Sequence, residues 1–229
     1  TGRMVAVEAL ARWRHPELGL VSPSQFIALA EEIGIIDEIG RWVLHEACRQ
    51  VITWQTQGFE VPRVAVNLSM KQVSPDLVNQ VGAILRHAGL APDRLELEVT
   101  ESAIMSQPEQ VLTVLHALVD NGVQVAVDDF GTGYSSLAYV KRLKMHRLKI
   151  DQSFVSDIGR DVRSEAIIRA IIAMARCLGL ETVAEGVERS DQVDFLRAEN
   201  CDIAQGRLFS YPLSAADLLS ARGPSAARL

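Results

Sequence analysis

The feature that most constrains this chain is a repeated alternation between short apolar segments and longer amphipathic ones. Alternation of strand and helix repeated this often predicts a parallel sheet joined by helical crossovers, either an open doubly wound sheet or an eight-stranded barrel. Seven segments have the length and flanking turn residues of strands. They are Met4–Leu10, Val64–Leu68, Leu95–Thr100, Val123–Asp128, Arg147–Ile150, Thr182–Glu185 and Asp202–Ala204.

Local signals mark the helices between these strands. Pro23 and Pro75 each follow a serine and open a segment with helical periodicity, as proline does in the first turn of a helix. Gly89 follows the second of these segments, where a left-handed residue is favoured. No GxGxxG motif follows the first strand, which disfavours a dinucleotide-binding sheet. No break in composition marks a boundary, so we expect one domain over residues 1–219 and a flexible tail over residues 220–229.

Composition excludes several classes of protein. The chain has 229 residues, of which 48% are hydrophobic, and a net charge of −6, so it is not disordered as a whole. The most apolar helical segment, Ala166–Leu180, is interrupted by Arg169 and Arg176, and neither a membrane span nor a signal peptide is visible. The acidic balance disfavours binding of long nucleic acid. Three scattered cysteines without a CxxC pair predict a reducing, cytoplasmic environment.

Polar side chains gather at the carboxyl ends of the predicted strands. In Leu95–Thr100, alternate side chains face opposite sides, so the apolar ones face the helices and Glu98 faces the interior. The ends of successive strands carry Glu8, Asn67, Glu98, Asp128, Asp129, Lys149 and Glu185, and Gln205 follows the last strand. A charged side chain that faces inward is unfavourable unless it is paired or binds a metal. Any one of these residues could be an ordinary ion pair or a cap, but their recurrence predicts a functional site.

The residue types indicate a divalent metal. Carboxylate and amide oxygens suit Mg²⁺ or Mn²⁺, and the histidines show no spacing typical of zinc ligands. The adjacent pair Asp128 and Asp129 can bridge two cations, an arrangement used for in-line displacement at phosphorus. The glycine-rich segment that follows is either an ordinary loop or one that orders on binding. Lys149 is an ion-pair partner by default, and in a hydrolase it would orient the attacking water.

A set of short motifs in this chain resembles the motifs of a known family. In chain order they are Glu8-Ala9-Leu10 with Arg12-Trp13, Asn67-Leu68-Ser69, Glu98-Val99-Thr100-Glu101, Asp128-Asp129-Phe130-Gly131-Thr132-Gly133, Lys149-Ile150-Asp151, Ala184-Glu185-Gly186-Val187-Glu188 and Gln205-Gly206. Each motif alone is weakly specific, but the ordered set resembles the EAL domain, a family that hydrolyses cyclic di-GMP. The resemblance covers about Thr1 to Leu213.

The resemblance implies a role for each matching residue. The positions that match metal ligands are Glu8, Asn67, Glu98 and Asp128 for a first ion, and Asp128, Asp129 and Glu185 for a second. The positions that match catalytic groups are Glu185, a general base, Lys149, which contacts the nucleophilic water, and Asp129. The positions that match substrate contacts are Leu10, Arg12, Glu188 and Gln205, with Arg12 on a phosphate. Glu101 matches a residue that anchors the loop Asp128–Tyr134, which lies near the dimer interface of the family.

The implied fold is of the α/β class, a modified TIM-like (β/α)₈ barrel with one antiparallel strand. That family has a helix and a strand before a Thr-Gly turn, and this chain starts at Thr1-Gly2. The seven strands predicted above agree with the loss of one. We therefore expect the N-terminal strand to be missing from this chain, which leaves the domain incomplete there. Either upstream residues supply the strand, which we favour, or the barrel lacks it. A missing strand exposes two sheet edges.

These expectations combine into a metal-dependent phosphodiesterase that opens cyclic di-GMP to linear pGpG with two Mg²⁺ or Mn²⁺ ions. Two alternatives are a catalytically inactive cyclic di-GMP receptor and another Mg²⁺-dependent barrel enzyme, such as one that stabilises an enolate. The complete set of matching residues favours the phosphodiesterase. By resemblance we also expect a homodimer and an upstream sensory or GGDEF-type domain. This domain would be cytoplasmic without membrane contact, whereas a full-length parent could be membrane-anchored elsewhere.

Overall fold

A computed structural model describes residues 4–106, 108–133, 137–221 and 226–229. Its centre is an eight-stranded sheet in which β1 and β4 to β9 run parallel and β10 runs antiparallel to β9. The strands in spatial order are β1 (Val7–Ala9), β4 (Val64–Asn67), β5 (Leu95–Thr100), β6 (Gln124–Phe130), β7 (Arg147–Ile150), β8 (Glu181–Ala184), β9 (Ile203–Gln205) and β10 (Ala226–Arg228).

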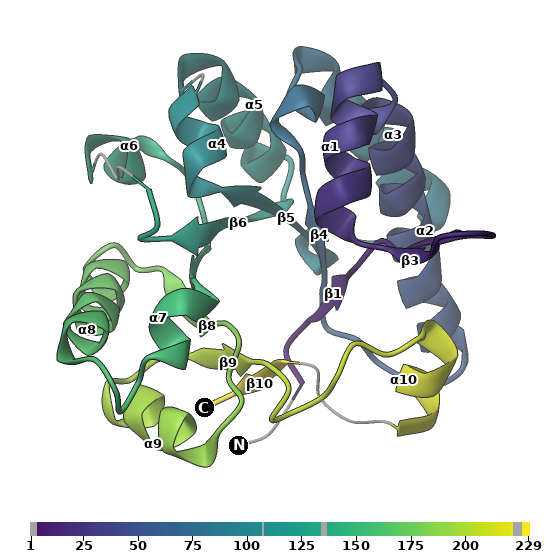
Figure 1. Cartoon of the computed structure of the whole chain (residues 1–229). Helices are drawn as coiled ribbons and strands as arrows, with labels where there is room; N and C mark the ends of the chain where they lie inside the picture. Colours follow the sequence, from purple (N-terminus) through teal and green to yellow (C-terminus); the bar gives the residue numbers. More distant parts are fainter. Residues whose placement is uncertain (1–3, 107, 134–136, 222–225) are drawn as a thin grey trace.

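Figure 1 shows these strands arranged around a central axis, with most helices outside them. The helices are α1 (Pro23–Ile33), α2 (Ile36–Thr56), α3 (Pro75–Ala88), α4 (Glu101–Ser106), α5 (Pro108–Asp120), α6 (Leu137–Arg142), α7 (Gln152–Ser156), α8 (Val162–Cys177), α9 (Ser190–Ala198) and α10 (Ala215–Ala221). Two 3₁₀ turns, η1 (Met70–Gln72) and η2 (Pro92–Arg94), precede α3 and β5. The TIM-like barrel class predicted from the sequence is confirmed. None of the described helices is both long enough and apolar enough to cross a membrane.

The core lies between the sheet and the helices. Leu95, Leu97 and Val99 on one face of β5 are completely buried, and they belong to the same apolar cluster as Leu115 and Leu118 of α5. Burial of a side chain of this size contributes about 2 kcal/mol. The other face of each strand points into the barrel interior. One cavity there, lined by Glu8, Glu96 and Lys149 among others, has a volume of about 20 Å³, roughly room for one water.

The helix boundaries follow the local signals in the sequence. Pro75 lies in the first turn of α3, and Gly89 ends this helix in the left-handed conformation, with φ 71°. The apolar side chains Leu77, Val81 and Leu85 are buried on one face of α3. Because the caps and the apolar face agree, the sequence alone located this helix.

Three strands were not predicted. A two-stranded antiparallel hairpin, β2 (Trp13–His15) and β3 (Gly19–Val21), projects beside α1. Each of its strands has only three residues, too few for a periodic pattern. We expected a flexible tail over residues 220–229. Residues 226–228 of that segment form the strand β10, which pairs with β9. The antiparallel strand of the sheet is thus contributed by the C-terminal end of the described chain, while Thr1-Gly2 lies outside the described residues.

Candidate active site

Four neighbouring strands bring charged side chains to one end of the barrel interior. Lys149, near the end of β7, is 2% exposed, and its ammonium group contacts three carboxylates. The Nζ atom lies 2.7 Å from Glu98 Oε2, 2.7 Å from Glu185 Oε1 and 3.2 Å from Asp128 Oδ2. These partners come from β5, β6 and the residue after β8, so the parallel register brings residues far apart in sequence to one point.

Glu8 of β1 is held by two amide side chains. Asn67 Nδ2, at the end of β4, donates to Glu8 Oε1 at 2.7 Å. Gln205 Nε2, at the end of β9, donates to Glu8 Oε2 at 2.7 Å, although these two residues are 197 positions apart in sequence. Both oxygens of the carboxylate therefore have fixed orientations across the barrel.

The pair Asp128 and Asp129 lies at an irregular point of β6. The register between β6 and β7 shifts between Val127 and Phe130. Asp129 has φ 53°, a left-handed conformation that is uncommon for residues other than glycine and often occurs at functional sites. The shift lets both carboxylates contribute to one cluster: oxygens of Asp128, Asp129 and Glu185 lie within 4.8 Å of one another.

The loop that follows is tied to α4. Glu101, 2% exposed, accepts a hydrogen bond at Oε2 from the backbone N–H of Gly131 at 2.9 Å. Gly131 has φ 97°, so glycine is favoured there. The sequence placed Glu101 as the anchor of the loop Asp128–Tyr134, and the described contact concerns its first part. Tyr134 lies outside the described residues.

Another glycine brings two strand ends together. Gly206, directly after β9, has φ 157°, and a Cβ atom there would lie 2.2 Å from the backbone oxygen of Val187. The backbone N–H of Val187 donates to the carbonyl of Gln205 at 3.0 Å. This close backbone approach holds Gln205 beside the segment that follows Glu185.

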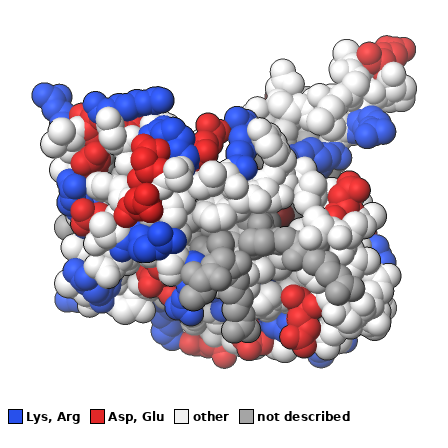
Figure 2. All heavy atoms as spheres, turned by 90° about the horizontal axis from the view of Figure 1, so that it is seen from below, with Lys and Arg blue, Asp and Glu red and all other residues white. Residues whose placement is uncertain are grey.

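Five carboxylates surround one ammonium group. Glu98, Asp128 and Glu185 contact Lys149, and Glu8 and Asp129 lie close enough to interact with its charge. Burial raises the pKa of Glu98 well above its ordinary value. Burial, with a smaller contribution from Asp128 and an opposing one from Lys149, raises the pKa of Glu185 to about 7. Burial and the neighbouring Asp128 raise the pKa of Asp129 to about 6. On the outer face seen in Figure 2, by contrast, acidic and basic side chains are interspersed.

Lys149 itself remains charged in this setting. Burial alone would lower its pKa, but the carboxylates of Glu98 and Glu185 outweigh burial and raise the pKa well above the ordinary value. One ammonium group cannot balance five carboxylates, so the site favours either additional protons or bound cations. The atoms that could bind a cation here are all oxygens, the ligand type that Mg²⁺ and Mn²⁺ prefer.

The remaining predicted residues border this cluster. Leu10 follows β1 and is 41% exposed. The exposed Arg12 donates from Nη1 to the carbonyl of its neighbour Ala11 at 3.0 Å. Glu188 forms an exposed ion pair with Arg207 at 3.0 Å. In the described part of the chain, neither Arg12 nor Glu188 hydrogen-bonds to the carboxylates.

Two residues beside the site were given no role from the sequence. Asp151, which caps α7, lies close to Asp129 and contributes to the raised pKa of that residue. Its position directly after β7 follows the same strand-end rule and could have revealed it. Arg207, the partner of Glu188, is an exposed arginine in a loop and carried no such signal.

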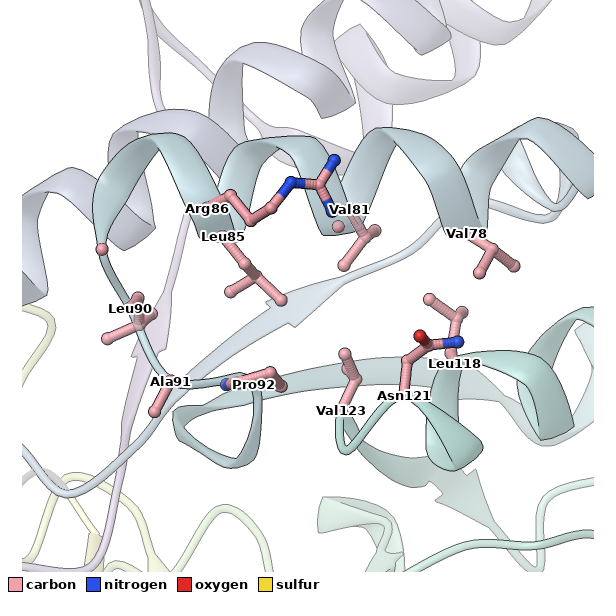
Figure 3. Close-up of a pocket in the computed structure, with 12 residues that line it drawn as sticks. Val78, Val81, Leu85, Arg86, Leu90, Ala91, Pro92, Leu118, Asn121 and Val123 are labelled. Carbon is pink, nitrogen blue, oxygen red and sulfur yellow. The ribbon is translucent and has the colours of Figure 1, made fainter.

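A larger hollow lies elsewhere. A groove of about 410 Å³ lies between α3 and the turns before β5 and β6, where Val81, Leu85, Pro92, Leu118 and Val123 line it (Figure 3). Its turns precede the strands, so it lies toward the amino ends of the strands, opposite the carboxylates. Its lining is mostly apolar, with Arg86 and Asn121 as polar members. The chemistry therefore points to the carboxylate end and not to this groove.

The fold and the site together define an α/β-barrel protein with an acidic centre at the carboxyl ends of its strands. The chain belongs to the EAL domain family, whose model matches residues 1–212. The family expected from the sequence motifs is thereby confirmed.

Two curated proteins of Pseudomonas aeruginosa are similar to the chain. Cyclic di-GMP phosphodiesterase NbdA is 49% identical over 95% of this chain and 28% of its own length. Bifunctional diguanylate cyclase/cyclic di-GMP phosphodiesterase MucR is 48% identical over 96% of this chain and 32% of its own length. The chain therefore spans about a third or less of these relatives.

A solved structure extends the similarity to three dimensions. The PaMucR phosphodiesterase in complex with c-di-GMP superposes with a TM-score of 0.91 at 46% identity. The match covers 95% of this chain and 88% of that one. The barrel and the order of its strands are thus those of a relative that binds this dinucleotide.

Proposed function

We propose that this chain is a metal-dependent phosphodiesterase that hydrolyses cyclic di-GMP to linear pGpG. The observation that carries the proposal is the cluster of five carboxylates around Lys149 in an EAL domain. Names of similar proteins support the substrate, since NbdA and MucR are cyclic di-GMP phosphodiesterases and the PaMucR structure contains c-di-GMP. These relatives are longer than this chain, so the assignment concerns this domain.

We assign the metal ligands from the donor set. Glu8, Asn67, Glu98 and Asp128 would hold one Mg²⁺ or Mn²⁺ ion, and Asp128, Asp129 and Glu185 would hold a second. Divalent cations at such a site stabilise charge on phosphoryl oxygens and lower the pKa of water. The hydrogen bonds from Asn67 and Gln205 would orient Glu8 before any ion arrives.

The protein side chains supply position and proton transfer. The Lys149 ammonium group would orient the attacking water, and its ion pairs with Glu98, Asp128 and Glu185 support this role. Glu185, beside Lys149 and Asp128, would accept a proton from that water. Asp129 contributes to the same cluster.

The bordering residues would bind the nucleotide. Arg12 is exposed and offers a planar, permanently charged group to a phosphate. Leu10 offers an exposed apolar side chain next to it. We assign Glu188 and Gln205 to the same substrate surface, and Glu101 to holding the start of the loop after Asp129.

A single substitution tests the assignment. In Glu8→Ala, the amides of Asn67 and Gln205 lose their carboxylate partner, and we expect turnover of cyclic di-GMP to be lost at saturating Mn²⁺. Glu17→Ala, an exposed glutamate in the hairpin turn, is the matched control and should retain full activity. Formation of pGpG is followed by chromatography. Retained turnover in Glu8→Ala would contradict the proposal.

The inactive-receptor alternative predicts a different result for the unaltered chain. It would bind cyclic di-GMP, measured by calorimetry, and form no pGpG with either Mn²⁺ or Mg²⁺. Turnover that EDTA abolishes and Mn²⁺ restores would instead support the phosphodiesterase. The two functions are therefore separated by comparing binding and turnover in one preparation.

We further propose the setting in which the domain works. Its three free cysteines, two of them buried, suit a reducing cytoplasm. By analogy with MucR, which is bifunctional, a diguanylate cyclase or sensory domain would lie upstream in a longer protein. We propose a homodimer, as the family resemblance implies, and sedimentation of the chain with cyclic di-GMP would test it.

A further inference from the structure

The segment that carries Glu185 and Glu188 is held by one buried glutamine side chain. Gln192 lies in α9, is 1% exposed and uses both ends of its carboxamide. Its Oε1 atom accepts from the backbone N–H groups of Glu188 at 2.8 Å and Arg189 at 2.9 Å. Its Nε2 atom donates to the carbonyl of Val155 in α7 at 2.8 Å. One side chain therefore joins the segment after β8 to the helix after β7.

A helix cap accounts for only one of these hydrogen bonds. Gln192 is the third residue of α9, and a glutamine there commonly accepts from the backbone N–H of the residue before the helix, here Arg189. The bonds to Glu188 and Val155 go beyond such a cap. A buried carboxamide is unfavourable unless its donors and acceptors are paired, so these bonds fix it in one orientation.

The same segment meets α7 at a second point. Gly186 has φ 66°, and a Cβ atom there would lie 2.6 Å from Cβ of Gln152, the first residue of α7. The backbone of Gly186 therefore lies directly against the start of α7, while Gln192 bonds to the carbonyl of Val155 near the end of that helix. The segment Glu185–Arg189 and its continuation into α9 are thus joined to both ends of α7.

The position of this segment decides where two side chains of the site lie. The backbone N–H of Glu185 donates to the carbonyl of Ile150 at 3.1 Å, and the Glu185 carboxylate lies 2.7 Å from Lys149 Nζ. Glu188 lies three residues further along the chain. Because Gln192 holds the backbone N–H of Glu188, loss of that contact would release the segment that carries both carboxylates.

We propose that Gln192 is a positioning residue whose carboxamide fixes the segment Glu185–Arg189 against α7. It thereby places Glu185 beside Lys149, and Glu188 at the border of the site. Gln192 is buried, so it acts through backbone groups and not through contact with the substrate. The effect on the backbone does not depend on the function proposed above, whereas the effect on turnover rests on that function.

A substitution in the full chain tests the proposal. Gln192→Met keeps a long, unbranched side chain with good helix propensity but cannot reproduce the three hydrogen bonds. Gln80→Met is the matched control in α3, where Gln80 donates to Asp76 of the same helix at 2.7 Å. Leu118→Ala, a fully buried residue of α5, controls for a general loss of stability. Hydrogen exchange is measured on all three variants and on the unaltered chain without metal.

The decisive amides are those that Gln192 does not contact. In Gln192→Met, we expect exchange at the backbone N–H groups of Glu185 and Val187 to accelerate about tenfold more than exchange at Leu97 in the centre of the sheet. Leu118→Ala should leave this ratio unchanged, because a general loss of stability also reaches the central strands. Protection at Leu97 shows that each variant folds.

A milder variant keeps the test decisive if Gln192→Met does not fold. Gln192→Asn retains a carboxamide but is one methylene shorter, so it cannot reach both Arg189 and Val155, and it should give the same exchange pattern. Acceleration confined to Glu188 and Arg189 in the folded variants would identify Gln192 as a helix cap only and would overturn the proposal.

The effect on the reaction has its own readout. At saturating Mn²⁺, the folded Gln192 variants should show a kcat for cyclic di-GMP about tenfold lower and a raised KM, whereas Gln80→Met and Leu118→Ala should keep both values. Faster exchange at Glu185 with unchanged kcat and KM would overturn the role of Gln192 in the reaction. If the unaltered chain forms no pGpG, the proposed function fails, and the exchange result still decides whether Gln192 positions the segment.

Discussion

The two ends of the barrel interior are built from the same strands but differ in charge balance. At the amino end, Glu96 of β5 lies 2.9 Å from Arg147 Nη1 and 3.2 Å from Arg63 Nη1, and Arg147 also pairs with Glu181 at 2.8 Å. At the carboxyl end, two residues further along each strand, Glu98 pairs with Lys149. There one ammonium group faces five carboxylates, whereas at the amino end each carboxylate has at least one arginine.

The difference shows how one sheet can carry a stabilising ion-pair network at one end and a candidate metal site at the other. A buried charge that is paired and hydrogen-bonded within the protein needs no further ligand. In a buried group of carboxylates, each charge raises the pKa of the others. Such a group is neutralised only when it binds protons or cations. Strand alternation places both kinds of group on the interior face, and the charge balance decides which end can bind metal.

The largest expected effect is on turnover at the carboxyl end. Asp128→Asn removes a charge that we assign to both metal ions, so we expect the turnover of cyclic di-GMP to fall by about 10³-fold, equivalent to about 4 kcal/mol. Asp120→Asn makes the same change in an exposed ion pair with Lys144 and should leave turnover unaltered. Turnover in Asp128→Asn within about tenfold of the unaltered chain would contradict the assigned role.

A matched pair of substitutions compares the two ends for stability. Glu96→Gln leaves Arg147 buried beside an uncharged amide, which should lower the free energy of unfolding by about 3 kcal/mol. Glu98→Gln should change it by less than about 1 kcal/mol in the metal-free chain, because Lys149 keeps Asp128 and Glu185 as partners. Urea denaturation at pH 7 measures both values, and equal losses would remove the distinction between the ends.

The raised pKa values predict how pH affects the carboxyl end. Without metal, Glu185 and Asp129 hold protons up to about pH 7 and about pH 6, above the ordinary range of carboxyl groups. A cation binds the ionised forms, so Mn²⁺ affinity should weaken as pH falls from about 8 to 6. Calorimetry in two buffers of different ionisation enthalpy should also detect released protons at pH 6.5. An affinity independent of pH would contradict these pKa values.

The smallest expected effect lies outside both ends. Glu188→Gln breaks an exposed ion pair with Arg207, which should change the free energy of unfolding by less than about 0.5 kcal/mol. If Glu188 also borders the substrate, the KM for cyclic di-GMP should rise while kcat stays nearly constant. A large loss of stability would show that this pair is more than a surface contact.

Regions with a repeated local pattern could be predicted from the sequence. In β5, six residues alternate between apolar and polar, so both the strand and the inward direction of Glu98 followed from periodicity. α3 was located by its proline, its glycine and one apolar face. The hairpin β2–β3 and the strand β10 have three residues each, and no period can be recognised over that length.

The sequence by itself determined the class of fold, the family and the residue types at the carboxyl ends of the strands. Periodicity and motifs are local features, so they can be recognised in the sequence alone. Only the tertiary structure decided which side chains meet. Gln205 holds Glu8 across 197 positions, and Asp129 reaches its cluster through a positive φ angle and a register shift. The strand β10 is recognised only through its antiparallel pairing with β9. Such contacts depend on chain closure in space, which no local pattern encodes.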